Sequence, residues 1–301
     1  MAATTLSGLC LINAALAQIY VANAASGTVG AYTTGGATIN TSLISGLNVP
    51  WGIAVSGGDL FVVNGDGRSI GEFTTAGATV NASLITGLNN PEALSISGGN
   101  LYVLNFGDGN PGAGTVGEYT TSGATVNASL VTGLTSPYSL AVSGGKIYVG
   151  GGGIPSAIGA YTTAGAAVNA SLISGLADPA DLAVSGGDIF VVNRSAGTIS
   201  EYTTAGALVT ANLISGLDLP MSIAVAGDDI FVGNDATGDV IAGRIGEYTT
   251  AGATVNASLI TGLNDPLGLD VEPAPEPSSW ALLAGGLGAW LLWRRGRTRL
   301  A

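Results

Sequence analysis

The sequence predicts an all-β chain folded as a six-bladed β-propeller. The sequence contains six copies of one repeat, and each copy has an aromatic residue directly before Thr-Thr. These aromatic residues are Tyr32, Phe73, Tyr119, Tyr161, Tyr202 and Tyr248. The spacings between them are 41, 46, 42, 41 and 46 residues. A period of about 40–45 residues with several short strands in each unit is typical of a propeller blade. The 49 glycines and the charged fraction of only 9% fit turn-rich β structure with a neutral polar surface.

Each unit divides into four short strands, which the second copy illustrates. The first strand is predicted over 50–56, and Gly57-Gly58 then turns the chain, because paired glycines favour the tight turns that match strand twist. The second strand, DLFVVN over 59–64, is rich in β-branched and aromatic residues. The third strand is predicted over 70–75 and the fourth over 78–86.

The first strand carries a motif that resembles a known repeat. Residues 50–55 read Pro-Trp-Gly-Ile-Ala-Val, and Gly-Asp-Leu-Phe-Val follows at 58–62. This pattern is similar to the NHL-type repeat over roughly residues 18–272. The resemblance implies that the first strand of each blade is innermost and lines a central channel.

The phase of the repeat predicts how the ring closes. First strands begin at six prolines, whereas the chain enters the repeats on a second strand, 18–23, and leaves them on a first strand, 266–272. Pairing of these two segments completes the sixth blade from both ends of the repeat region. A closed ring also removes the exposed edges that an open array of strands would offer to aggregation.

The N-terminal segment, 1–17, is expected to be a secretory signal peptide. An apolar run ends in Ala15-Leu16-Ala17, a small-x-small cleavage pattern before Gln18. The first five residues hold no Lys or Arg, so a truncated start or a strand-like lead-in is the alternative.

The C-terminal segment consists of three parts that differ in composition. A linker over 273–277 contains Pro275, Glu276 and Pro277; an apolar run over 278–293 follows, and Arg294 and Arg295 open a basic tail over 294–301. The order of these parts resembles a PEP-CTERM sorting signal. The resemblance implies a membrane-crossing sorting helix, cleavage by an exosortase-type protease, and display at the surface of a Gram-negative cell. The alternative is a permanent single-span anchor.

Composition excludes several kinds of chemistry. The chain has no histidine, which removes the commonest general base and a common metal ligand. Cys10 is the only cysteine, so no disulfide forms within the chain. The net charge of −12 disfavours nucleic acid, because the phosphate backbone is repelled.

Acidic residues on the first strands raise the possibility of an enzyme. Glu92, Asp181 and Asp270 come from different blades and could face a common channel. Carboxylate and amide oxygens suit Ca²⁺, so a calcium-dependent hydrolase or lactonase is the second hypothesis. It requires three or more such groups to converge on one metal position; the alternative is that these acids are solvated residues of the rim.

The copies differ from one another mainly on one face of the ring. By strand direction, the uniform Gly-Gly hairpins and Thr-Thr-x-Gly turns share one face. The loops between second and third strands, and between fourth and first strands, share the other. The two 46-residue repeats carry insertions over 106–114 and 235–243, in blades three apart.

Ligand-binding residues are predicted on that variable face. Trp51 and Tyr138 follow the prolines of their blades and could stack on a sugar or cap a peptide. Asp108, Asp235 and Asp239 lie in the insertions and, like Asp66, could hold a loop Ca²⁺, although none has the spacing of a known calcium loop. No cofactor is otherwise expected. The sequence therefore predicts an exported, non-enzymatic propeller that presents a loop face to polysaccharide or protein; the alternative is that these copies have drifted without a ligand.

Overall fold

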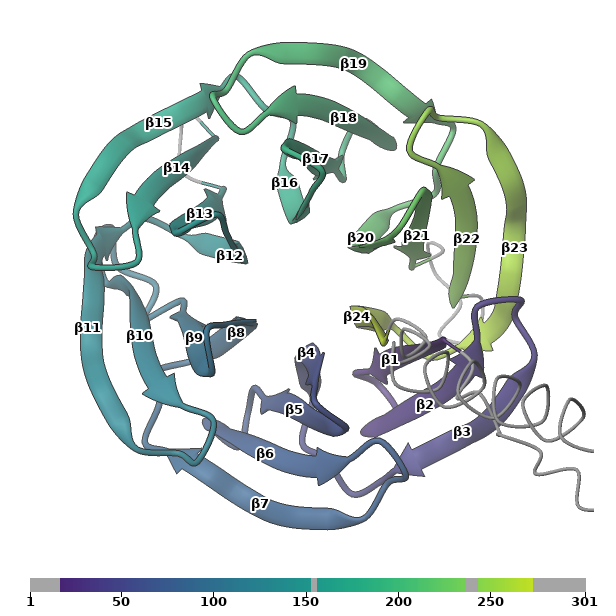
Figure 1. Cartoon of the computed structure of the whole chain (residues 1–301), viewed down its shortest axis with the longest axis horizontal. Coiled ribbons are helices and arrows are strands. Elements are labelled where there is room, and N and C mark those ends of the chain that lie inside the picture. The colour runs from purple at the N-terminus through teal and green to yellow at the C-terminus, as the bar shows by residue number, and fades with distance from the viewer. Residues whose placement is uncertain (1–16, 153–155, 236–242, 273–301) are drawn as a thin grey trace, which may run out of the picture. The chain divides into compact units, whose positions relative to one another are not determined.

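The computed structural model describes residues 17–152, 156–235 and 243–272. Within them the regular structure is entirely β, and it forms six antiparallel sheets of four strands arranged around an axis (Figure 1). The predicted six-bladed propeller is confirmed. The predicted signal peptide, linker, sorting helix and basic tail lie outside the described residues.

We label the blades A to F in ring order and list their strands from the innermost outward. Blade A contains β24 (Pro266–Glu272), β1 (Gln18–Asn23), β2 (Thr28–Thr33) and β3 (Thr38–Ile44). Blade B contains β4 (Pro50–Ser56), β5 (Asp59–Asn64), β6 (Ser69–Thr74) and β7 (Thr79–Thr86). Blade C contains β8 (Pro91–Ser97), β9 (Asn100–Asn105), β10 (Gly114–Thr120) and β11 (Thr125–Leu134).

The other three blades follow the same order. Blade D contains β12 (Pro137–Ser143), β13 (Lys146–Gly151), β14 (Ala157–Thr162) and β15 (Ala167–Ser174). Blade E contains β16 (Pro179–Ser185), β17 (Asp188–Asn193), β18 (Thr198–Thr203) and β19 (Leu208–Ser215). Blade F contains β20 (Pro220–Ala226), β21 (Asp229–Asn234), β22 (Gly243–Thr249) and β23 (Thr254–Leu263).

The predicted strands of the second copy match the structure closely. The first two are confirmed to the residue, whereas β6 begins and ends one residue earlier than predicted and β7 begins one residue later. Thr75 belongs to the turn and not to the strand, because its N–H donates to the carbonyl of Gly58 in the neighbouring hairpin.

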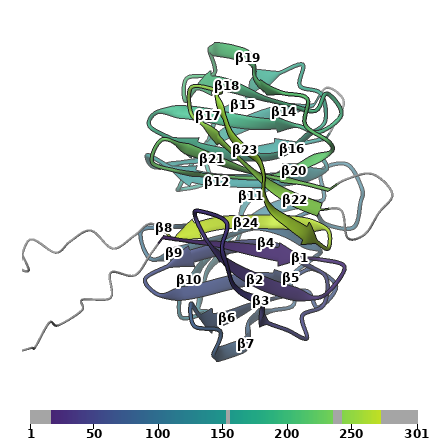
Figure 2. The same ribbon diagram turned by 90° about the vertical axis from the view of Figure 1, so that its right-hand side faces the viewer.

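Blade A closes the ring from both ends of the repeat region, as the phase predicted. β24 pairs antiparallel with β1, in a register that places Gln18 opposite Glu272 and Tyr20 opposite Asp270. The Tyr20 hydroxyl donates to Oε2 of Glu272 at 3.1 Å, which ties the two chain segments together by side chains as well. Figure 2 shows β1 and β24 side by side.

The hydrophobic core is divided into six clusters, each between adjacent blades. One cluster combines Tyr20 and Val29 of blade A with Ile53 and Phe73 of blade B, all buried. Burial of this kind stabilises each blade only through its neighbours, so the ring holds together as one cooperative unit.

Hydrogen bonds confirm how the loops divide between the two faces. On the uniform face, the N–H of the second Thr of the Thr-Thr turn donates to the hairpin between the first and second strands in five blades, as Thr75 does to Gly58. The hairpin is Gly-Gly in four of these blades and Gly227-Asp228 in blade F. On the variable face, the residue after each second strand donates to the carbonyl before the blade's proline; the six donors are Ala24, Gly65, Phe106, Gly152, Arg194 and Asp235. Both Gln18 and Glu272 lie at the uniform face, where the inner strands end and the second strands begin.

The outermost strands are edges, and five of them carry the same local hydrogen bond. The Asn side chain of each Asn-x-Ser triplet accepts the N–H of the Ser two residues on, as in Asn81 to Ser83 at 3.1 Å. The register with the third strand shifts at that point, for instance between the pairs Ile70–Ile85 and Glu72–Asn81. Bulges of this kind disfavour edge-to-edge pairing. Blade E has Thr210 in place of the Asn, but its register shifts in the same way, so the shift does not depend on this hydrogen bond.

Candidate functional site

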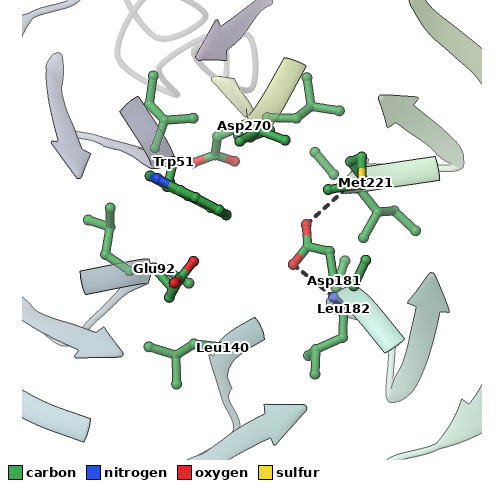
Figure 3. Close-up of a pocket in the computed structure, with 18 of the residues that line it drawn as sticks. Trp51, Glu92, Leu140, Asp181, Leu182, Met221 and Asp270 are labelled. Carbon is green, nitrogen blue, oxygen red and sulfur yellow. Dashed lines mark hydrogen bonds between the residues drawn. The ribbon is translucent and has the colours of Figure 1, made fainter. Parts of the chain in front are cut away.

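A central cavity of about 640 Å³ runs along the inner strands. Residues of β4, β8, β12, β16, β20 and β24 line it, which confirms the prediction that the first strand of each unit faces the channel. Figure 3 looks into this channel and shows Trp51 and Glu92 on one side and Asp181 and Met221 across from them.

The variable-face end of this cavity is a ring to which every blade contributes. We call this ring the mouth. Going round from blade B to blade A, its members are Trp51, Glu92, Tyr138, Asp178, Arg194, Asp235 and Asp265. Each lies next to the proline that begins an inner strand or just after a second strand. The mouth is therefore built from the positions at which the copies differ.

One half of the mouth is aromatic, and glycines make room for its rings. Trp51 lies over Gly65, where an added Cβ would meet the indole Nε1 at 2.6 Å. Tyr138 lies in the same way over Gly152, where an added Cβ would meet its Cε2 at 2.9 Å. Phe106 packs against Tyr138 with ring centroids 5.4 Å apart. The phenyl ring that packs against Tyr138 thus comes from the insertion in blade C.

Glu92 lies between these aromatic residues in ring order, on β8 between β4 and β12. Its side chain is 9% exposed, and it faces the cavity. Within the described part of the chain, the one hydrogen bond to this side chain comes from Nδ2 of Asn90, at a long 3.5 Å. Burial raises the pKa of Glu92 to about 7. The carboxyl is thus held in a place that has little to stabilise its charge.

The other half of the mouth is charged. Arg194 follows β17, and its backbone N–H donates to the backbone carbonyl of Asp178 at 3.1 Å. Burial raises the pKa values of Asp235 and Asp265, and the positive charge of Arg194 opposes that rise in both. Arg194 therefore acts as the counter-charge of this half.

Deeper in the channel, Asp181 and Asp270 brace neighbouring blades. Asp181 accepts the N–H of Leu182 at 2.8 Å and, from blade F, the N–H of Ile223 at 3.0 Å (Figure 3). Asp270 accepts the N–H of Val271 and, from blade B, that of Val55, both at 2.8 Å. The interpretation of these acids as solvated rim residues is wrong, because they satisfy the inner-strand N–H groups that face the channel.

Burial also changes how these two carboxyls ionise. It raises the pKa of Asp181 to about 7 and that of Asp270 to about 6, although the N–H donors oppose the rise in each case. Ser95 makes the corresponding contact in blade C, where its Oγ accepts the N–H of Val142 at 3.1 Å. Polar side chains of the inner strands thus link adjacent blades at several points of the ring.

The described acids do not fit a calcium centre. Among residues 17–152, 156–235 and 243–272, no group of three or more acidic side chains comes together in a way that could hold a metal ion. Glu92, Asp181 and Asp270 all line the cavity, but two of them already accept two backbone N–H groups each. The convergence that the enzyme hypothesis requires is not met by these three carboxyls.

The remaining predicted site residues fall in different places. Trp51, Tyr138 and Asp235 line the cavity. Asp108 does not line it; this exposed residue accepts the N–H of Asn110 at 3.1 Å, which lowers its pKa. Asp239 and the sorting residues Pro275, Glu276, Pro277, Arg294 and Arg295 lie outside the described residues. Of the residues that are described, none forms a helix with the length and hydrophobicity to span a membrane.

Sequence reasoning missed Asp178, Arg194 and Asp265 as members of the site. The available signal was variation among the copies: the residue before the proline and the residue after the second strand both change from blade to blade. The hydrogen bond between these two positions, repeated in all six blades, explains why they meet at the mouth.

Comparison with known proteins supports the architecture. A chain from a nidogen/laminin complex is 13% identical, with a TM-score of 0.70 over 86% of this chain and 100% of its own length. A gluconolactonase from Xanthomonas campestris is 14% identical, with a TM-score of 0.58 over 74% of this chain and 80% of its own. A calcium-binding protein, regucalcin, from Agrobacterium tumefaciens is 15% identical, with a TM-score of 0.55 over 74% of this chain and 84% of its own.

At the level of sequence there is no corresponding match. No protein-family model matches the chain, and no curated protein matches it. At identities this low, the structural likeness shows the six-bladed propeller fold and nothing finer.

Proposed function

We propose that this chain is an exported, non-enzymatic binding propeller that holds a protein or polysaccharide at the mouth of its channel. The observation that carries the proposal is the contrast between its two faces. The uniform face repeats the same turns, whereas the mouth has a different side chain from each blade. A ligand site is expected where repeats diverge around a concave opening, since pockets with a few placed polar and aromatic groups are the usual binding sites.

Two further observations fit presentation of this face. Gln18 and Glu272, the first and last residues of the described strands, lie at the uniform face, opposite the mouth. One structural neighbour belongs to a complex of two proteins, nidogen and laminin, which shows that this architecture occurs in protein assemblies.

We further propose that the C-terminal segment is a PEP-CTERM-like sorting signal, cleaved by an exosortase-type protease on the way to the cell surface. The order Pro275-Glu276-Pro277, apolar run and arginine cluster supports it. Mass spectrometry of the surface form tests this: a C-terminus near Glu276 is expected, and an intact Arg297 would exclude cleavage.

Binding is tested with the full chain on arrays of glycans and of peptides. We compare the natural chain with Tyr138→Ala at the mouth and with Asp228→Asn, an exposed residue of the uniform face. The proposal expects a ligand whose binding is lost in the first variant and kept in the second. Binding that survives Tyr138→Ala but fails with Asp228→Asn would contradict it.

A calcium titration separates this function from the hydrolase hypothesis. Because the described carboxyls form no group suited to a metal ion, we expect millimolar calcium and a chelator to leave ligand binding at the mouth unchanged. Loss of binding on chelation would favour the calcium-dependent alternative.

A further inference from the structure

The cavity carries an excess of negative groups over positive ones. Among the described residues, its lining contains six carboxyl groups and one guanidinium, that of Arg194; the carboxyls belong to Glu92, Asp178, Asp181, Asp235, Asp265 and Asp270. The charges of these groups repel one another more strongly inside a protein than in water. A cationic ligand would relieve this repulsion.

Most of these carboxyls already have a partner or a nearby positive charge. Asp181 and Asp270 accept backbone N–H groups. Asp178 accepts the hydroxyl of Ser195 at 3.2 Å, and the positive charge of Arg194 acts on Asp235 and Asp265. Glu92 differs from all of these. It is 91% buried, since 9% of its surface is exposed, and its only described hydrogen bond is the long one from Asn90.

The surroundings of Glu92 suit a cation with a hydrocarbon part. Trp51 and Tyr138 flank it on the neighbouring inner strands, and the faces of aromatic rings attract cations. Tyr138 is 38% exposed, so its ring is open to a ligand. Leu140, on the neighbouring inner strand β12, adds apolar lining on this side of the cavity.

The spacing of the acids favours an organic cation over a metal ion. A calcium ion, for example, needs several oxygen atoms at about 2.3–2.6 Å. The described acids form no such group. An alkylammonium group needs only one carboxylate together with aromatic contact, and this half of the mouth provides both.

We propose that the aromatic half of the mouth is a subsite for an alkylammonium group, with Glu92 as its counter-charge and Trp51 and Tyr138 as its walls. The inference rests on the proposed binding function and names the chemistry that the mouth recognises. The ammonium group comes either from a lysine side chain of a partner protein or from a free amine. Neutral polysaccharide does not carry it.

Calorimetric titration of the full chain tests the subsite. The probes are Nα-acetyl-lysinamide, the neutral Nα-acetyl-norleucinamide, free cadaverine and a trilysine peptide. We expect the lysine derivative to bind and the norleucine derivative not to bind, and we expect affinity to fall as salt is added. Tighter binding of trilysine than of cadaverine identifies a protein segment as the source, and the reverse order identifies a free amine.

Variants assign the effect to named residues. Glu92→Gln keeps the shape and removes the charge, so we expect it to weaken binding of the lysine derivative by about tenfold or more, as for a lost buried charge contact. Trp51→Leu is expected to weaken it by about three- to tenfold. Asp228→Asn on the uniform face controls for net charge and should leave affinity within about twofold.

The inference and the proposed function fail in different ways. Equal binding of the lysine and norleucine derivatives, or an affinity unchanged by Glu92→Gln, overturns the alkylammonium subsite. If a glycan then binds the natural chain and is lost in Tyr138→Ala, the proposed function stands without it. Thermal unfolding of each variant confirms that a loss of binding does not reflect a loss of fold.

Discussion

The indole ring of Trp51 lies directly on the backbone of Gly65, at the entrance to the channel. An added Cβ on Gly65 would meet Nε1 of Trp51 at 2.6 Å and Cδ1 at a still shorter distance. Gly65 has no positive φ, so the glycine is required for space and not for backbone conformation. Tyr138 and Gly152 repeat the relationship in blade D. Aromatic residues therefore occupy the mouth only where the loop opposite is glycine.

This relationship predicts a coupling that a double-mutant cycle can measure. Gly65→Ala should destabilise the chain by about 1–3 kcal/mol, because the new methyl group displaces the indole ring from a well-packed position. In a Trp51→Ala background the same substitution should cost much less. Denaturant unfolding of the four chains gives the coupling energy. Equal costs in the two backgrounds would show that the methyl group is accommodated without moving Trp51.

Stability is expected to fall as the pH rises. The pKa values of Glu92, Asp181 and Asp270 are raised to about 7, 7 and 6, from about 4 in the unfolded chain. A raised folded-state pKa gives stability that is complete below the unfolded value and is lost as pH rises through the folded value. We expect the Tm at pH 5 to exceed that at pH 8 by about 5 °C or more.

A variant identifies the groups responsible for this pH dependence. Glu92→Gln removes one titrating carboxyl, so it should raise the Tm at pH 8 and reduce the difference between the two pH values. Asp66→Asn, exposed in the loop after β5, changes the net charge equally and serves as the control. A flat profile in the natural chain would mean that the channel acids stay ionised at pH 5.

The closure of blade A predicts a local effect at the junction of its two chain segments. Tyr20→Phe removes the hydroxyl that donates to Glu272 and should lower stability by about 1–2 kcal/mol. Phenylalanine fits this position, because Phe61, Phe190 and Phe231 occupy it in other blades. Hydrogen exchange should show faster opening of β24.

A matched substitution in blade C provides the comparison. Tyr102→Phe removes a hydroxyl that donates to Glu118 at 3.2 Å, within a blade made from one continuous segment. Its effect on exchange should stay within blade C. Equal acceleration of β24 by both substitutions would argue against a special role of the Tyr20–Glu272 contact in closure.

The residues before the blade prolines predict a stabilising substitution. All six have positive φ; Asn90, Asp178 and Asp265 suit that conformation, whereas Val49 (φ 50°) and Leu219 (φ 45°) do not. Val49→Asn should stabilise the chain by about 1 kcal/mol, since it relieves steric strain in a left-handed conformation. The reverse exchange, Asn90→Val, should destabilise it by a similar amount. Denaturant midpoints measure both, and a destabilised Val49→Asn chain would show that the valine side chain contributes more than its strain costs.

Much of the fold follows from local patterns in the sequence. The period and the alternation of apolar residues predict the strands, and the phase of the repeat predicts that Gln18–Asn23 and Pro266–Glu272 share a blade. The same phase predicts which loops share a face, because strand direction alternates regularly. Even the offset at Thr75 is small, since it reflects one hydrogen bond of the turn.

The site depended on contacts that the linear order does not contain. Trp51 and Tyr138 were predicted as ligand-binding residues because they vary, but their support by Gly65 and Gly152 arises where two loops of one blade meet. Asp181 and Asp270 resemble solvated rim residues in the sequence; they brace neighbouring blades because the N–H groups of adjacent inner strands point into the channel. The repeat thus determined the ring and its closure through local propensity and periodicity. Only the tertiary structure decided the mouth, because distances between blades select which of the varied side chains face one another.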